Sequence, residues 1–173
     1  MGLGKPKIIS LFSGAGGLDI GFEKAGFRTI YATDVWKTAC DTLKKNHLAN
    51  EVYCGDIRDI DFKALKERYK DIDCLIGGPP CPPYSQTRHY LIGKADGFQD
   101  EHAGFAVPEY FRALKELQPK VFFFENVDGF DRLQPRKKIA KDNTIYAEAL
   151  LHKSKIHLRV HYCKMYFIFY SRK

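Results

Sequence analysis

The apolar residues of the chain fall into short runs that are separated by stretches with helical periodicity. The runs predict buried strands at residues 7–12, 29–33, 51–54, 71–76 and 120–127. The stretches between them predict helices after residue 17 and at residues 36–47, 62–69 and 107–117. Because strands and helices alternate, we expect a Rossmann-like α/β fold, with a mainly parallel sheet and helices on both of its faces.

A glycine-rich turn joins the first predicted strand to its helix. This turn, which we call the glycine loop, consists of Ser13, Gly14, Ala15, Gly16 and Gly17. Glycines let the backbone approach a ligand closely, and the following helix start offers free N–H groups and partial positive charge. We expect the helix to pack through Leu18, Ile20, Gly21 and Phe22. The loop is therefore a candidate ligand site.

An acidic residue ends the second predicted strand. Asp34 follows Gly14 by 20 residues, which is where nucleoside-binding α/β units carry the acid that holds ribose hydroxyls. Asp19 stands where the dinucleotide fingerprint requires glycine. The pattern thus argues against NAD and favours another adenosine-bearing ligand.

The fourth predicted strand leads into a cluster of glycines and prolines around one cysteine. The sequence is Gly-Gly-Pro-Pro-Cys-Pro-Pro over residues 77–83, with Cys81 in the cluster. Prolines stiffen the chain, so we expect Cys81 to be presented on a rigid loop at the carboxyl end of a strand, where open α/β sheets place their chemistry. The alternative is a proline-rich ligand strip, since PxxP occurs twice here. Such strips usually lie in polar sequence, and this one directly follows a hydrophobic strand.

Charge and cysteine content narrow the class of protein. The net charge of +7 comes from residues 132–173, which carry 11 Lys and Arg against 2 Asp and Glu. We expect a first domain at residues 1–131 and a basic tail at 132–173, which suits either a polyanion partner or a solvated end.

The five cysteines are Cys40, Cys54, Cys74, Cys81 and Cys163, and they do not have metal-ligand spacing. We therefore expect a cytoplasmic protein with no metal site and no membrane anchor, and with inert core thiols at Cys54 and Cys74.

Five motifs in order resemble those of the DNA cytosine-carbon-5 methyltransferases. They are Phe12-Ser-Gly-Ala-Gly-Gly17, Asp34, Gly55-Asp-Ile57, Gly78-Pro-Pro-Cys81 and Glu125-Asn-Val127. The resemblance covers about residues 7–130 and implies S-adenosylmethionine as the methyl donor and cytosine in DNA as the acceptor. It also implies a bacterial-type restriction-modification system.

The resemblance implies a role for each matched residue. The glycine loop would hold the methionine portion of the donor, with the Phe12 ring near the sulfonium. Asp34 would bind the ribose hydroxyls, and either Val35 or Trp36 would lie against the adenine. The remaining implied donor contacts are Asp56, Ile57 and Pro79, and the implied catalytic residues are Pro80, Cys81, Glu125 and Asn126.

Chemistry supports the roles of Cys81 and Glu125. Carbon 5 of cytosine is a poor nucleophile until a soft nucleophile adds to carbon 6, and a cysteine thiolate suits this task. A carboxylic acid at ring nitrogen 3 can supply the proton that the addition demands, which Glu125 fits, although a glutamate here could also merely cap the next turn. The base must first leave the duplex stack.

The chain departs from the family pattern in two places. Proline follows Cys81 where the family more often has glutamine, although Tyr84 and Ser85 match its aromatic-serine pair. The family's arginine-rich strand motif, recognition domain and closing helix are not recognisable after the Glu-Asn-Val motif, so the chain is expected to be truncated. A separate polypeptide is then an expected partner that would supply the recognition region.

Three other functions remain open at this stage. The Pro82-Pro83-Tyr84 segment is similar to the end of the amino-nitrogen methyltransferase motif, but Cys81 is a poor acceptor for an exocyclic amine. A transfer-RNA cytosine-5 methyltransferase shares the same motifs. A truncated domain that binds the donor without turnover is the alternative that is not an enzyme.

Overall fold

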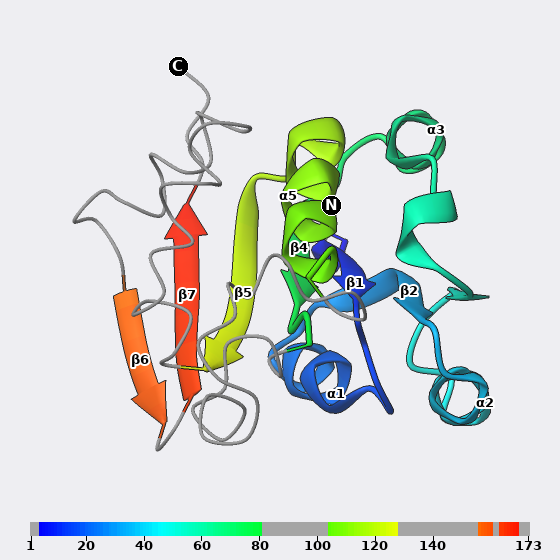
Figure 1. The fold of residues 1–173 in the computed structure, drawn as a ribbon, viewed down its shortest axis with the longest axis horizontal. Helices are drawn as coiled ribbons and strands as arrows, with labels where there is room; N and C mark the ends of the chain where they lie inside the picture. The colour runs from blue at the N-terminus through cyan, green and yellow to red at the C-terminus, as the bar shows by residue number, and fades with distance from the viewer. Residues whose placement is uncertain (1–3, 81–103, 128–155, 161–162, 170–173) are drawn as a thin grey trace.

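The computed structural model describes residues 4–80, 104–127, 156–160 and 163–169, and they form one twisted sheet covered by helices (Figure 1). The elements in chain order are β1 (Lys7–Leu11), α1 (Gly17–Lys24), β2 (Arg28–Asp34), α2 (Lys37–Lys45), β3 (Glu51–Cys54), the 3-10 helix η1 (Ile57–Asp59), α3 (Phe62–Tyr69), β4 (Cys74–Gly77), α5 (Ala106–Leu117), β5 (Val121–Val127), β6 (Ile156–Val160) and β7 (Cys163–Phe169). The strand order is β3-β2-β1-β4-β5-β7-β6.

The first five strands are parallel. β1 pairs with β2 on one side and β4 on the other, while β2 pairs with β3 and β4 with β5. The Rossmann-like α/β fold expected from the sequence is thereby confirmed. Parallel pairing places the carboxyl ends of these strands along one edge, where the loops that follow β1, β2, β3 and β4 meet.

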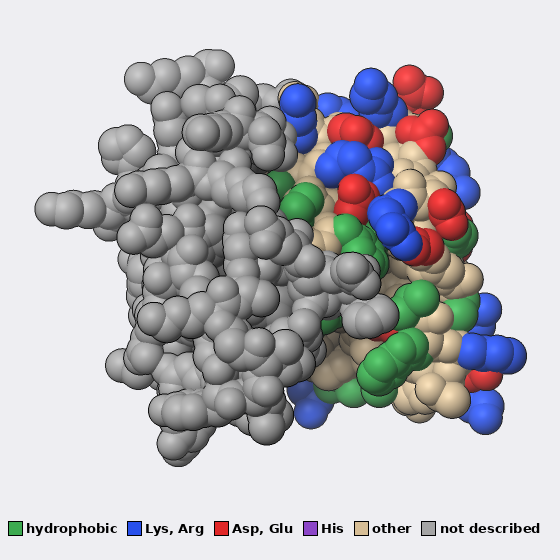
Figure 2. Space-filling view, in the orientation of Figure 1, with side chains coloured by type: hydrophobic (Ala, Val, Ile, Leu, Met, Phe, Trp, Pro, Cys, Tyr) green, Lys and Arg blue, Asp and Glu red, His purple; other side chains and the backbone are tan. Residues whose placement is uncertain are grey.

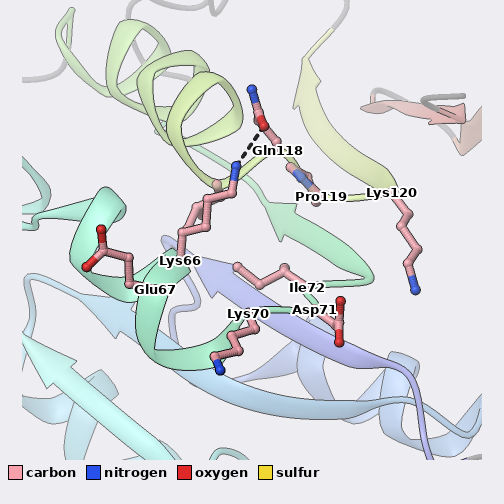
Figure 3. A pocket seen from close by; sticks show the side chains of 9 residues that line it. Lys66, Glu67, Lys70, Asp71, Ile72, Gln118, Pro119 and Lys120 are labelled. Atoms are coloured by element: carbon pink, nitrogen blue, oxygen red, sulfur yellow. Dashed lines mark hydrogen bonds between the residues drawn. The ribbon is translucent and has the colours of Figure 1, made fainter. Parts of the chain in front are cut away.

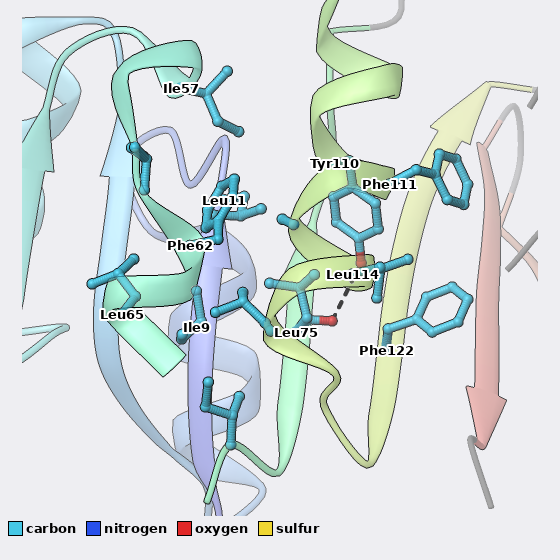
Figure 4. Packing of buried hydrophobic residues seen from close by; sticks show 14 of the residues in the cluster. Ile9, Leu11, Ile57, Phe62, Leu65, Leu75, Tyr110, Phe111, Leu114 and Phe122 are labelled. Carbon is cyan, nitrogen blue, oxygen red and sulfur yellow. Dashed lines mark hydrogen bonds between the residues drawn. The ribbon is translucent and has the colours of Figure 1, made fainter. Parts of the chain in front are cut away.

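Helices cover both faces of the sheet. On one face, α3 and α5 pack against Ile9, Leu75 and Phe122 in the largest core cluster (Figure 4). On the other face, Leu18 and Phe22 of α1 pack against residues of β1, β4 and β5, and α2 packs against β2 through a third cluster. Side chains alternate between faces along a strand, so each inner strand needs apolar residues on both sides. This requirement explains the uninterrupted apolar runs in the sequence.

The expected packing side of α1 was partly wrong. Ile20 is 39% exposed and Gly21 is also exposed, whereas Asp19 is fully buried. A helix turns about 100° per residue, so the positions that share the sheet-facing side with Leu18 are Asp19 and Phe22, and Ile20 points away from the sheet. The sequence pattern did not place Asp19 on the packing side, because its hydroxyl partners, Ser10 and Thr29, lie on neighbouring strands.

Two strands lie within the stretch that was expected to be a basic tail. β7 runs antiparallel along the whole of β5, from the pair Val121 and Phe169 to the pair Val127 and Cys163, and β6 pairs with β7. Part of the stretch 132–173 therefore extends the same sheet, while the domain boundary at residue 131 stays a prediction. Within the described residues, no helix combines the length and the apolar character that crossing a bilayer requires.

Tyr110 ties α5 to the centre of the sheet. Its ring is fully buried and lies 5.1 Å from that of Phe124, centroid to centroid. Its hydroxyl lies 2.8 Å from the carbonyl oxygen of Phe123 and 3.3 Å from that of Leu75. A Cβ at Gly77 would lie 2.9 Å from this ring and 2.7 Å from the Leu11 carbonyl oxygen. Burial raises the pKa of Tyr110 well above its usual value, so the hydroxyl stays a donor.

We expect Tyr110→Phe to lower the free energy of unfolding by about 1–3 kcal/mol, because a buried carbonyl group loses its hydrogen bond. The measurement is urea unfolding monitored by circular dichroism. Tyr69→Phe is the control, since the Tyr69 hydroxyl bonds Glu51 in an exposed pair and should contribute less than 1 kcal/mol. Equal stabilities of the two variants would contradict the role assigned to Tyr110.

Candidate functional site

A cavity of about 690 Å³ opens at the carboxyl ends of the parallel strands. The loops after β1, β2, β3 and β4 and the start of α5 contribute to its walls. Its lining residues are Phe12, Gly14, Thr33, Asp34, Val35, Trp36, Gly55, Asp56, Ile57, Arg58, Gly78, Pro80, Phe105 and Ala106. Residues far apart in sequence thus meet at one site, and eight of the sixteen predicted site residues are among them.

The glycine loop has a backbone that depends on glycine. Gly14 and Gly16 have φ angles of 54° and 91°, a region that residues with a Cβ rarely adopt. A Cβ on Gly16 would also lie 2.3 Å from the Leu48 side chain, so the loop packs closely on the region after α2. Phe12, which precedes the loop, has a φ angle of 53° without being glycine. Such strain is characteristic of functional sites.

Asp34 holds two sides of the cavity together. One carboxylate oxygen accepts from the Gly14 N–H at 2.8 Å and the other from the Trp36 N–H at 2.9 Å. The residue is half-buried. A carboxylate has about four lone-pair sites, so both oxygens keep acceptor capacity for a ligand.

Two apolar side chains next to Asp34 are unusually exposed. Val35 is 63% and Trp36 is 73% exposed, although both line the cavity. Thr33, which also lines the cavity, has a buried hydroxyl with no hydrogen-bond partner among the described residues. The wall after β2 therefore offers an apolar surface together with unused hydrogen-bonding capacity, as ligand sites commonly do.

Asp56 is already engaged by a neighbouring arginine. Its carboxylate accepts from the Arg58 backbone N–H and from the Arg58 Nε, each at 2.9 Å. These bonds, with the side-chain bond as the larger cause, hold the pKa of Asp56 below its usual value. The Arg58 guanidinium also lies 4.3 Å above the centre of the Phe105 ring at the start of α5. Sequence reasoning missed Arg58 and Phe105, since only the fold brings them together.

The ends of β4 and β5 bring a carboxylate and an amide beside the proline segment. Gly77 pairs with Phe124, so Gly78 lies next to Glu125. A Cβ on Gly78 would be 2.5 Å from a Glu125 carboxylate oxygen, which shows how closely that carboxylate approaches the backbone. Asn126 is fully buried and its amide donates to the Pro79 carbonyl oxygen at 3.2 Å. Glu125 and Asn126 thus flank the segment that leads to Cys81, which itself lies outside the described residues.

The other thiols differ in their surroundings. Cys74 is buried in β4, where desolvation raises the pKa of its thiol to about 12, as expected for an inert core residue. Cys54 is exposed, so the expectation of a core position was wrong for this residue. β3 is the edge strand of the sheet, and its end is open to solvent.

A second hollow, of about 660 Å³, lies at the opposite ends of β4 and β5, between the last turns of α3 and α5 (Figure 3). Its charged groups are already paired in part: Lys66 donates to Gln118 at 2.7 Å, and Lys120 pairs with Asp73 at 2.6 Å. It contains no residue that the sequence marked as functional. Over the part of the face that α3 covers, basic and acidic side chains are interspersed (Figure 2), as on an ordinary solvated surface.

The structure brings the predicted donor contacts together only in part. Those that line the cavity are Phe12, Gly14, Asp34, Val35, Trp36, Asp56 and Ile57. The predicted catalytic residue Pro80 is at its rim. The predicted contacts Ser13, Ala15, Gly16, Gly17 and Pro79 are not part of its lining. Within the described ranges, no group of three or more His, Cys, Asp or Glu side chains is arranged to hold a metal ion.

Comparisons with known proteins identify a family and several similar proteins. The family model described as C-5 cytosine-specific DNA methylase matches residues 6–158. The chain is 46% identical over 123 residues to the Type II methyltransferase M.FnuDI of Fusobacterium nucleatum, covering 71% of the chain and 33% of that relative. It is 44% identical over 127 residues to M.AquIA of Picosynechococcus, covering 71% of the chain and 49% of the relative. The chain thus spans a third to a half of the length of these relatives.

A solved structure shares the fold. The methyltransferase EhMeth of Entamoeba histolytica superposes with a TM-score of 0.69 at 20% sequence identity, over 97% of this chain and 54% of that structure. The family match extends beyond the region of motifs recognised in the sequence, into β6.

The bond from Asn126 to Pro79 predicts an effect of charge and pH. Asn126→Asp keeps the size of the side chain but places an acceptor against a carbonyl oxygen, so we expect a loss of about 1–3 kcal/mol in unfolding free energy at pH 7. Burial would raise the pKa of the new carboxyl group, and its protonated form could donate. The loss should therefore shrink as the pH falls toward 4 and grow as it rises.

Asn50→Asp is the matched control for this pH series. The Asn50 side chain already accepts from Arg28 through its oxygen, so a carboxylate at this exposed position should cost little or stabilise. Thermal unfolding at several pH values measures both variants. A pH-independent loss at residue 126 would contradict the assigned direction of the hydrogen bond.

Proposed function

Because the chain belongs to the family of C-5 cytosine-specific DNA methylases, we propose that it takes part in methyl transfer from S-adenosylmethionine to carbon 5 of cytosine in DNA. The observation that carries the proposal is the convergence of the glycine loop, Asp34 and Asp56 on one cavity, with Glu125 at the adjacent strand end. The names of the relatives, which are Type II methyltransferases, support DNA as the substrate and a restriction-modification role.

The cavity fits the donor in size and in chemistry. Drug-sized ligands occupy cavities of roughly 300–1,000 Å³ with apolar walls and few polar groups. Asp34 retains acceptor capacity for the ribose hydroxyls, the exposed Trp36 and Val35 offer an apolar surface for adenine, and Asp56 would accept from its amino group. When bound, the donor supplies an electrophilic methyl group on a sulfonium.

The chain's own residues would prepare the cytosine. The Cys81 thiolate would form a bond to carbon 6, while Glu125 gives a proton to ring nitrogen 3 and so removes the developing negative charge. Carbon 5 becomes nucleophilic as a result. After methylation, a water molecule would take the proton from carbon 5, and the electrons of that C–H bond would expel the Cys81 sulfur as a thiolate. The proton on ring nitrogen 3 would return to Glu125, which restores the aromatic ring and the starting acid. Asn126 would contribute by holding Pro79, two residues before the nucleophile.

The order of the strands would separate donor binding from the reaction at the base along the edge of the sheet. The proposed donor contacts would come from the loops after β1, β2 and β3, and the groups that act on the base would come from the ends of β4 and β5. The action on DNA would take place in the cytoplasm. A separate polypeptide that supplies a recognition region stays a prediction, as do a transfer-RNA substrate and a donor-binding domain without turnover.

Donor binding can be measured on the 173-residue chain itself. We expect calorimetry to detect binding of S-adenosylhomocysteine, and Asp34→Ala to weaken it at least tenfold, because the loop and the wall after β2 lose their common acceptor. Asp41→Asn is the control, since Asp41 pairs with Lys37 on the exposed side of α2. An absence of binding at millimolar ligand would refute the proposed pocket.

The proposed nucleophile can be trapped when this chain is combined with the part of a family member that it does not cover. DNA with 5-fluorocytosine at the target should form a covalent adduct, because fluorine cannot leave as a proton does. Cys81→Ala should form none, and Cys54→Ala should form the adduct normally. Glu125→Gln should lower turnover by about 10²–10⁴, the range for one positioned acid. Trapping in Cys81→Ala would assign the reaction to another residue.

A further inference from the structure

A carboxylate is buried below the glycine loop without a cationic partner. Asp19 is fully buried at the start of α1, and among the described residues no Lys, Arg or His forms an ion pair with it. Its two oxygens accept from hydroxyls on neighbouring strands: Ser10 of β1 at 3.1 Å and Thr29 of β2 at 3.0 Å. Desolvation raises the pKa of Asp19, because burial makes the ionised form of the carboxyl group less favourable.

The carboxylate fixes the direction of a chain of hydroxyl groups. The Ser10 hydroxyl donates to one oxygen of Asp19. The oxygen of Ser10 is then available as an acceptor, and the Ser13 hydroxyl lies 2.8 Å from it. The Ser13 hydroxyl also lies 3.1 Å from the Ser10 carbonyl oxygen. The proton of Ser13 is therefore directed inward, toward β1.

Ser13 is the first residue of the glycine loop and organises the residues after it. Its own N–H donates to the Thr33 carbonyl oxygen at 3.0 Å, and its carbonyl oxygen accepts from the Gly16 N–H at 2.9 Å. The next residue, Gly14, donates to Asp34. The loop is thus attached from below through Ser13 and from the side through Asp34. Two of its residues have left-handed backbone angles that other arrangements of the chain would not retain.

We propose that Asp19 is a positioning residue for the donor-binding loop, acting through Ser10 and Ser13 rather than by contact with the donor. The proposal rests on the proposed function, because it assumes that the glycine loop binds the donor. Thr29 shares Asp19 but is not part of the path to the loop. Both hydroxyl partners of Asp19 should therefore contribute to stability, but only Ser10 should contribute to donor binding.

The test compares Ser10→Ala with Thr29→Val in the full 173-residue chain. Each removes one buried hydroxyl that donates to Asp19, so we expect the melting temperature to fall in both variants. The decrease should be at least as large in Ser10→Ala, because Ser13 also loses the Ser10 hydroxyl as an acceptor. Ser10→Ala should weaken S-adenosylhomocysteine binding roughly tenfold, the ratio that corresponds to about one hydrogen bond, whereas Thr29→Val should change it less than twofold. Ser10→Thr keeps the hydroxyl and should restore the affinity. Equal affinities of the Ala and Val variants would overturn the proposal.

Hydrogen exchange supplies a readout that needs no donor. Exchange of the Gly14 and Gly16 amides should accelerate in Ser10→Ala and in Asp19→Ala but not in Thr29→Val, and the effects of the first two should not add in the double variant because both break the same path. Loop amides that respond equally to all three variants would make Asp19 a merely structural residue. Wild-type protein that binds no S-adenosylhomocysteine would instead refute the proposed pocket. Loop exchange that is faster in both Ser10→Ala and Asp19→Ala, but not in Thr29→Val, would still identify the path.

Discussion

The hydrogen bonds from the Gly14 and Trp36 amides to the Asp34 carboxylate join two loops that would otherwise be independent. The glycine loop leaves β1 in left-handed conformations, and the segment after β2 carries exposed apolar side chains. Neither arrangement is favourable in isolation, because strained backbone and exposed apolar surface both cost free energy. A carboxylate at the end of β2 can bridge them only because β1 and β2 are parallel neighbours whose carboxyl ends lie together.

The same geometry governs the centre of the sheet. β4 lies between β1 and β5, and Gly77 leaves space for both the Leu11 backbone and the Tyr110 ring. Because the strands approach so closely, the ends of β4 and β5 bring Gly78 against Glu125 and Pro79 against Asn126. The proposed donor pocket and the edge with the proposed catalytic residues are therefore consequences of one strand order.

Much of this arrangement was predictable from sequence, for identifiable reasons. Apolar runs located β1, β2, β3, β4 and β5, and the spacing from Gly14 to Asp34 marked Asp34 as a candidate ligand contact. The bonds from the Gly14 and Trp36 amides to Asp34 were not predicted. What failed depended on contacts between distant segments. The burial of Asp19 depends on Ser10 and Thr29 of neighbouring strands, and nothing in the sequence pairs Arg58 with Phe105. β7 was not among the predicted strands, and its antiparallel pairing with β5 is known only from the fold.

The pairing of Asp56 with Arg58 gives the cavity a resident competitor. A ligand amino group that reaches this carboxylate either replaces the hydrogen bonds from Arg58 or forms additional ones. The free energy gained from recognition is therefore the difference between the new hydrogen bonds and those that Arg58 loses. Discrimination follows from this balance: an amino group can replace the arginine, whereas a carbonyl group at the same position would face the carboxylate oxygens and gain nothing. The guanidinium contacts the Phe105 ring at the start of α5 while it is bonded to Asp56. If adenine binds at Asp56 as proposed, selectivity between purine rings would therefore depend on Arg58, a side chain of the cavity wall.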